Sequence, residues 1–238
     1  MRLLLPVIAP FLLGFSPPQL IDLSQDEEAF EDAFKEALNE AKKGDPEAHD
    51  RLGWAYENGR GVELDYKAAA HHYRIAAQGG NEHSRWRLGV MIDEGRTLGE
   101  LSEAVALFTI GAQNGYLDAL VSLAVMQATG RGTERDFTAA LGSYMKAAKA
   151  GNAAGIRGVA LMIVLGEGVE ADPQEAASWF MVAGALGNQD AINNLNIVLE
   201  QMIEPDRGAI AARAYEVAEE LGLEITIVFE ENSDTQKS

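Results

Sequence analysis

The chain of 238 residues contains no cysteine. This absence excludes disulfide scaffolds, thiolate zinc sites, iron–sulfur clusters, a cysteine nucleophile and a lipidated cysteine anchor. Aromatic residues are also scarce, at 7% of the chain, whereas apolar residues make up 47% and glycine contributes 24 residues. A chain of this composition is expected to bury a sizeable core in which helices approach closely around small residues.

Basic residues are few compared with acidic ones. Lysine and arginine number 19 against 37 aspartates and glutamates, which gives a formal net charge of −18. Phosphate backbones and anionic membrane surfaces repel such a chain. We therefore expect no nucleic acid partner and no direct membrane binding by the mature protein.

The N-terminus has the order of residues found in an export signal. Arg2 precedes an apolar run over residues 3–15, which as a helix would cover only about 20 Å of a hydrocarbon core that is about 30 Å thick. We expect residues 1–16 to be a signal peptide and residues 17–26 to be a linker, which predicts a periplasmic or secreted protein. Because Pro17 disfavours cleavage, an uncleaved anchor and a buried N-terminal segment are the alternatives.

A repeat of 35 to 36 residues organises the rest of the chain. Each unit has a landmark glycine, followed four residues later by a small residue and four residues after that by an aliphatic one. The landmark glycines are Gly44, Gly80, Gly115, Gly151 and Gly187, with Gly222 one period further on. We expect five repeats that begin near these glycines and together occupy residues 44–222.

Each unit is expected to consist of two helices joined by a glycine-containing loop, which gives an all-α, α/α superhelical solenoid. Polar residues suited to cap a helix stand before seven of the ten predicted repeat helices, and the landmark glycine can end the helix before it in the left-handed conformation. Glycines inside the first helix, Gly53 and Gly89, predict a neighbouring backbone that leaves no room for a side chain. The expected caps are Asp45, Asn81, Asn152 and Asn188 for first helices, and Asp65, Asp136 and Asp172 for second helices.

The first repeat contains the run Leu-Gly-Trp-Ala-Tyr-Glu-Asn-Gly-Arg-Gly-Val at residues 52–62 and Asp-Tyr-Lys-Ala at 65–68. Together with Tyr-Met-Lys-Ala-Ala-Lys-Ala-Gly at residues 144–151, this sequence closely resembles the Sel-1-like repeat family, a relative of the tetratricopeptide repeats. The fifth repeat departs most from the pattern, with Asn196 and Met202 in place of glycines, as is expected of a terminal cap. The resemblance implies an α-solenoid used for protein–protein interaction, in bacteria often in the cell envelope.

Two segments flank the repeats. Residues 27–43 are predicted to form an amphipathic N-terminal capping helix, a half-repeat that covers the first hairpin. The C-terminal tail, residues 223–238, contains a strand-like run at 225–229 that either packs along the last helix or serves as a flexible contact segment. The apolar face of the capping helix is formed by Phe30, Phe34, Ala37, Leu38 and Ala41.

Residues suited to chemistry are few and do not form a catalytic set. Ser143 and Lys146 have the Ser-x-x-Lys spacing of penicillin-recognising enzymes, but the companion motifs of those enzymes are absent from the sequence. His72 is expected to pack at an aromatic position of the repeat, and on a helix it cannot readily share a metal ion with its neighbour His71. The remaining histidines are His49 and His83. We expect no catalytic residue, no metal site and no cofactor.

The favoured function is therefore a non-enzymatic scaffold, monomeric by itself, that binds an unidentified protein. The alternatives are an envelope hydrolase of the β-lactamase or peptidoglycan-active type and a carbohydrate-binding accessory protein that uses exposed tryptophans. The expected partner-binding strip on the concave face of the first helices contains Asp50, Trp54, Trp86, Val90, Val121, Val125, Arg157, Leu161, Asn193 and Ile197. A second feature is a ladder of loop arginines that either stabilises the loops or binds an acidic partner, formed by Arg60, Arg96 and Arg131.

Overall fold

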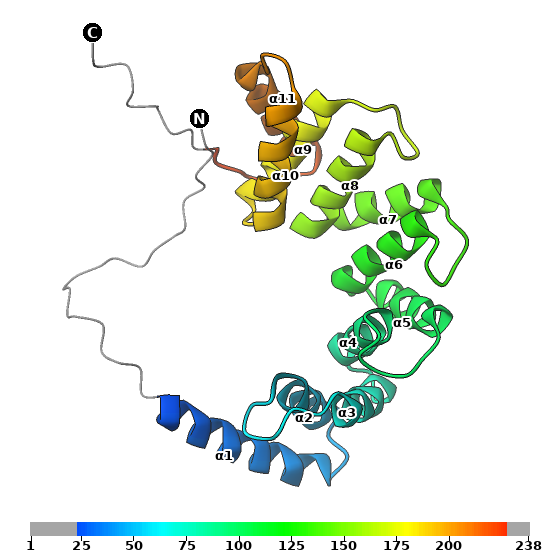
Figure 1. Ribbon diagram of the computed structural model, residues 1–238, viewed down its shortest axis with the longest axis vertical. Coiled ribbons are helices and arrows are strands. Elements are labelled where there is room, and N and C mark those ends of the chain that lie inside the picture. The colour runs from blue at the N-terminus through cyan, green and yellow to red at the C-terminus, as the bar shows by residue number, and fades with distance from the viewer. Residues whose placement is uncertain (1–22, 228–238) are drawn as a thin grey trace, which may run out of the picture. The chain divides into compact units, whose positions relative to one another are not determined.

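The computed structural model describes residues 23–227, with side chains from residue 27 onward. Within this part of the chain there are eleven α-helices and no strand, which confirms the predicted all-helical solenoid (Figure 1). None of the described helices is both long enough and apolar enough to cross a membrane. The expected signal at residues 1–16 lies outside the described residues.

The described helices belong to two compact units, and the chain passes from one to the other between Arg135 and Asp136. In each unit, helices that follow one another in the sequence pack against one another, except that α11 packs on α9 and not on α10. The N-terminal unit contains α1 (Leu23–Ala41), α2 (Pro46–Asn58), α3 (Tyr66–Gln78), α4 (Glu82–Asp93), α5 (Leu101–Gln113) and α6 (Leu117–Thr129). The C-terminal unit contains α7 (Phe137–Lys149), α8 (Ala153–Leu165), α9 (Pro173–Ala185), α10 (Gln189–Gln201) and α11 (Arg207–Glu220).

The helix boundaries follow from local chemistry that the sequence displays. All seven predicted caps accept a hydrogen bond from a backbone N–H in the first turn of their helix, and Pro46 occupies the first helical position of α2. Every landmark glycine has a positive φ, from +69° at Gly222 to +94° at Gly80, the conformation that ends a helix with little cost only for glycine. The two-helix period is thus fixed by interactions within a few residues.

The glycines inside the first helices face aromatic rings, not the neighbouring backbone as the sequence suggested. A Cβ atom added to Gly53 would lie 2.6 Å from the ring of Tyr73, and one added to Gly89 would lie 2.6 Å from the ring of Phe108. Both rings come from the second helix of the same repeat and are fully buried. The missing side chain therefore forms a notch that receives an aromatic ring.

Helix α1 occupies the place of a second helix. A Cβ on Gly61 would lie 2.2 Å from the carbonyl oxygen of Phe30, just as a Cβ on Gly132 would lie 2.4 Å from that of Leu101, the first residue of α5. Both pairs are 31 residues apart, so Phe30 corresponds to the start of a second helix. This register confirms α1 as a half-repeat.

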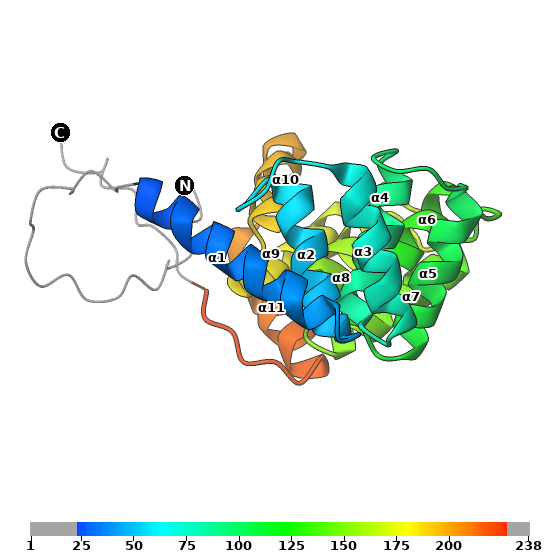
Figure 2. The same ribbon diagram turned by 90° about the horizontal axis from the view of Figure 1, so that it is seen from below.

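The bounds predicted for α1 were inexact. The helix begins at Leu23, inside the expected linker 17–26, and ends at Ala41, two residues before the predicted end. Its N-terminal end extends past α2 in both views (Figures 1 and 2). Residues 27–29 are exposed, and the acidic Glu27 and Glu28 favour the first turns of a helix.

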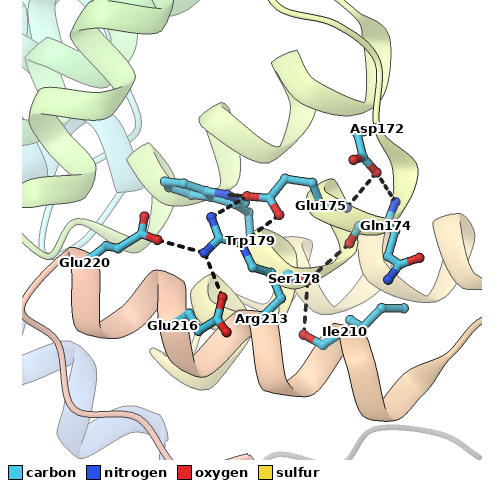
Figure 3. Close-up of polar contacts among 9 residues, drawn as sticks. All are labelled: Asp172, Gln174, Glu175, Ser178, Trp179, Ile210, Arg213, Glu216 and Glu220. Carbon is cyan, nitrogen blue, oxygen red and sulfur yellow. Dashed lines mark hydrogen bonds and ion pairs between the residues drawn. The ribbon is translucent and has the colours of Figure 1, made fainter.

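The fifth helix pair departs from the others, as the degenerate sequence predicted. Helix α11 packs against α9, where Arg213 forms two hydrogen bonds to Glu175, at 2.9 and 3.0 Å. The hydroxyl of Ser178 donates to the backbone oxygen of Ile210, and the indole of Trp179 donates to Glu175 (Figure 3). The hydrogen bonds to Glu175 and to two glutamates of α11 raise the pKa of Arg213. Helix α9 is thereby covered by α11.

The C-terminal tail packs on α11 as far as it is described. Ile227 is buried, and its backbone N–H donates to the hydroxyl of Tyr215 at 3.2 Å. Residues 223–227 form no regular secondary structure, and the rest of the strand-like run lies outside the described residues.

Two glycine substitutions distinguish the contribution of close packing to stability from that of backbone conformation. Gly61→Ala places a methyl group against the Phe30 carbonyl at a positive φ, so we expect a loss of about 3 kcal/mol in unfolding free energy. Gly44→Ala is the control, because Gly44 also has a positive φ but has no atom within 4 Å of its added Cβ; its loss should be about 1 kcal/mol. Urea denaturation measures both values, and equal losses would contradict the close contact between α1 and the loop.

Candidate functional site

A cavity of about 250 Å³ lies in the N-terminal unit between α1 and α2, and His83 of α4 also lines it. Its walls are mainly apolar, and the ring of Trp54 stands at its edge, 43% exposed and 6.1 Å from the ring of Phe30. Phe34 is held in an edge-to-face contact with Tyr56, with the ring centroids 5.3 Å apart. The cavity is lined by Phe30, Ala33, Phe34, Ala37, Asp50, Arg51, Trp54, Ala55, Arg60 and His83.

Fixed polar groups border the cavity on the side of α4. An oxygen of Asp50 accepts a hydrogen bond from the hydroxyl of Ser84 at 2.6 Å and lies 2.8 Å from Nδ1 of His83. Burial by itself would raise the pKa of Asp50, but the contacts with His83 and Ser84 lower it below its usual value. Asp50 is therefore an ionised group held in one orientation between two first helices.

The predicted arginine ladder ties neighbouring repeats together. Arg96 contacts Glu57 at 3.3 Å, and Arg131 lies 2.7 Å from the carboxylate of Asp93. In each case the loop of one repeat reaches the C-terminal end of the first helix of the repeat before it. Arg60 has no such carboxylate among the described residues, and its guanidinium lies 5.3 Å from the ring centroid of Phe30.

A buried polar network at the end of α2 was not anticipated from the sequence. The side chain of Glu57 is only 3% exposed, and it accepts hydrogen bonds from the hydroxyl of Tyr73, at 2.8 Å, and from the guanidinium of Arg87. Burial first, and then the charge of Glu57, raises the pKa of Tyr73. The available signal was the spacing: Glu57 and Asp93 both follow a helix glycine by four residues.

The strip residues predicted for partner binding lie on first helices, as their spacing required, but they differ in exposure. Trp86 is only partly exposed, because its indole donates to Ser122 at 2.9 Å and its ring lies 6.0 Å from that of Tyr116. The exposed members are Trp54, Val125, Asn193 and Ile197. The partly buried members are Asp50, Trp86, Val90, Val121, Arg157 and Leu161.

Two of the four histidines are brought together in the first repeat. The Nδ1 atoms of His49 and His72 are 2.9 Å apart, and the ring of His72 stacks on Tyr56. The buried aromatic position assigned to His72 is taken by Tyr73, while His72 lies half-buried beside it. Burial, and then the neighbouring His49 and His71, lowers the pKa of His72 to about 4. Over residues 23–227 no group of three or more His, Asp or Glu residues is placed to hold a metal ion.

The Ser-x-x-Lys pair lies on α7. Lys146 is exposed and Ser143 is partly buried. The helix turns its alanines and Tyr144 into the core. The pair thus sits at the margin of a packing face and not in the cavity described above.

Comparison with known protein families matches the Sel1 repeat to residues 46–81, 83–116, 117–152 and 153–188. One similar solved structure is c5321, a protective antigen present in uropathogenic Escherichia coli strains that displays an SLR fold; it is 22% identical with a TM-score of 0.69. That alignment covers 84% of this chain but only 45% of c5321.

A Sel1 repeat protein from Oxalobacter formigenes is 24% identical with a TM-score of 0.62, over 84% of this chain and 83% of that one. These likenesses show the fold. No curated protein matches the chain.

The low pKa of His72 predicts a loss of stability in mild acid. His72 takes up a proton near pH 6.5 in the unfolded chain but only near pH 4 in the folded protein. The contribution of neutral His72 to the unfolding free energy is therefore fully present above pH 6.5 and is lost as the pH falls toward 4. Allowing for solvent screening of a half-exposed ring, we expect a loss of about 1 kcal/mol between pH 7 and pH 5. Urea denaturation across this range gives the slope of unfolding free energy against pH. This slope should be shallower for His72→Gln than for wild type, whereas the exposed control His71→Gln should keep most of the wild-type slope. An unchanged slope in His72→Gln would refute the assignment.

Proposed function

The chain belongs to the Sel1 repeat family, whose solenoids are generally scaffolds for protein–protein interaction, and from this premise we propose that it is a non-enzymatic adaptor of the bacterial cell envelope. It binds a segment of a partner protein at the cavity between α1 and α2. The observation that carries this proposal is the cavity itself, which combines an apolar lining with a half-exposed tryptophan and a few fixed polar groups.

The composition of the cavity suits recognition of a protein segment. Tryptophan and arginine dominate the energetics of many interfaces, and Trp54, Arg51 and Arg60 all line this one. Asp50 is already oriented by His83 and Ser84, so little ordering entropy is lost there on binding. A partner that buries Trp54 gains apolar contact without disturbing the repeat core.

The proposed location rests on the N-terminal sequence. Arg2 and the apolar run over residues 3–15 have the order of a secretory signal. The chain also lacks cysteine, so its folding does not depend on the redox state of the compartment.

Partner binding should depend on Trp54. Because the ring is half-exposed, Trp54→Ala should lower the melting temperature by only a few degrees but remove at least nine-tenths of the captured partner. Quantitative mass spectrometry after capture from an envelope extract measures this loss. Leu98→Ala is the matched control, since Leu98 is 94% exposed and lies outside the cavity. Equal capture by wild type and Trp54→Ala would place the partner elsewhere.

Export should remove the N-terminal segment. A C-terminally tagged full-length protein is expected in the envelope fraction with an N-terminus near Pro17. Fractionation followed by N-terminal sequencing gives the answer directly, and an intact Met1 in the cytoplasmic fraction would contradict the proposed location.

A further inference from the structure

The cavity occupies the place of a missing helix. In the N-terminal unit each later second helix packs between two first helices: α3 lies between α2 and α4, and α5 lies between α4 and α6. Helix α1 has the register of a second helix but packs only on α2 among the described elements. One side of α1 therefore lacks the first helix that would complete its repeat.

The side chains of α1 show what is absent. Ala37 stands 36 residues before Tyr73 and 71 before Phe108, the two rings that enter the glycine notches of their own first helices. At this position α1 carries a methyl group where the complete repeats carry an aromatic ring. Ala37 lines the cavity, so the space corresponds to an aromatic side chain that none of the described residues supplies.

An arginine of the cavity also lacks the carboxylate partner that its equivalents in later repeats have. Arg96 and Arg131 each pair with a carboxylate at the end of the preceding first helix. Arg60 is the equivalent arginine of the first full repeat, and it lines the cavity without a carboxylate partner among the described residues. By the register of the repeats, that carboxylate would come from the first helix that would precede α1.

We propose that an amphipathic helix of the partner protein occupies this place and completes the repeat. The geometry gives this helix a two-residue signature: a bulky apolar residue that fills the space above Ala37, and an aspartate or glutamate four positions later that pairs with Arg60. The spacing follows from α2 and α4, in which Gly53 and Gly89 face the ring of their own repeat. Glu57 and Asp93, four positions later, pair with the loop arginine of the next repeat. This inference rests on the proposed function and names the chemistry of its partner.

The first helices of this chain provide the probe. A labelled peptide of residues 81–95 carrying Gly89→Phe presents both features in the correct register, and the same peptide with Gly89 retained is the matched control. Fluorescence anisotropy with the full-length protein should show that the phenylalanine peptide binds at least tenfold more tightly. Equal affinities, or no binding of either peptide, would overturn the proposal.

Substitutions in the protein, in place of the peptide, test whether the peptide binds in the cavity. Ala37→Phe supplies the missing wedge from within and should weaken binding of the phenylalanine peptide at least tenfold. Because Ala37 is buried and its variant can fail to fold, Ala33→Glu offers a second test at an exposed residue of the cavity rim. Ala106→Glu, at an exposed site on α5, should leave binding unchanged. Full binding by Ala33→Glu would exclude this site.

The charge pair is tested by a double-mutant cycle. Arg60→Gln in the protein and Asp93→Asn in the peptide should each weaken binding about threefold, and together no more than either alone. Arg74→Gln is the control, because Arg74 pairs with Glu103 and does not line the cavity. Additive effects of the two changes would refute the pairing.

Other occupants give distinct results. If the chain's own N-terminal residues fill the cavity, Phe11→Glu with Phe15→Glu in the full chain should raise peptide affinity at least tenfold, which would overturn the proposal. Self-association that is abolished by Ala33→Glu, measured by sedimentation, would assign the site to a second copy and overturn it equally. Trp54-dependent capture without peptide binding would retain the proposed function and reject only the helix.

Discussion

The N-terminal unit depends on the insertion of an aromatic ring into a glycine notch. The ring of Tyr73 lies over Gly53, and that of Phe108 lies over Gly89, at distances that admit no side chain on the glycine. This contact sets the separation of the two helices, and it also positions polar groups: the hydroxyl of Tyr73 reaches Glu57 only because its ring lies in the notch. Apolar packing and the buried polar network therefore share one geometric origin, and a change in the notch should disturb both.

The helices were predictable because their limits are decided locally. A cap such as Asp65 bonds to amides two and three residues away, and a landmark glycine adopts its conformation irrespective of the rest of the fold. The neighbours of a helix face are decided by tertiary packing, so the sequence did not reveal whether Gly53 meets a backbone or a ring. The partners of Glu57 lie 16 to 39 residues away, which no local pattern specifies. The path of α11 onto α9 was missed for the same reason.

The candidate site likewise combines a feature that local sequence predicts with features that depend on tertiary packing. Helical spacing placed Trp54 and Trp86 on the predicted strip, but at different positions of the repeat: Trp54 corresponds to Val90, and Trp86 corresponds to Asp50. Trp86 has a following first helix that offers Ser122 as a hydrogen-bond acceptor and lies near Tyr116, whereas Trp54 borders a cavity because α1 supplies only half a repeat. The exposure of each strip residue thus depends on its contacts with neighbouring repeats, which become apparent only when the repeats are assembled.

Arg213 links α11 to α9, because it donates hydrogen bonds to Glu175 of α9 and to Glu216 and Glu220 of α11. Proteins of this architecture lengthen when a unit of their gene is duplicated, and each new unit must find a regular hairpin on both sides. Because α11 already covers α9, a unit appended after it would meet an irregular surface. Duplication within the regular units before α9 keeps a matching neighbour on either side, so we expect homologues of different length to gain or lose whole 36-residue units in the interior and to keep their final helix pair.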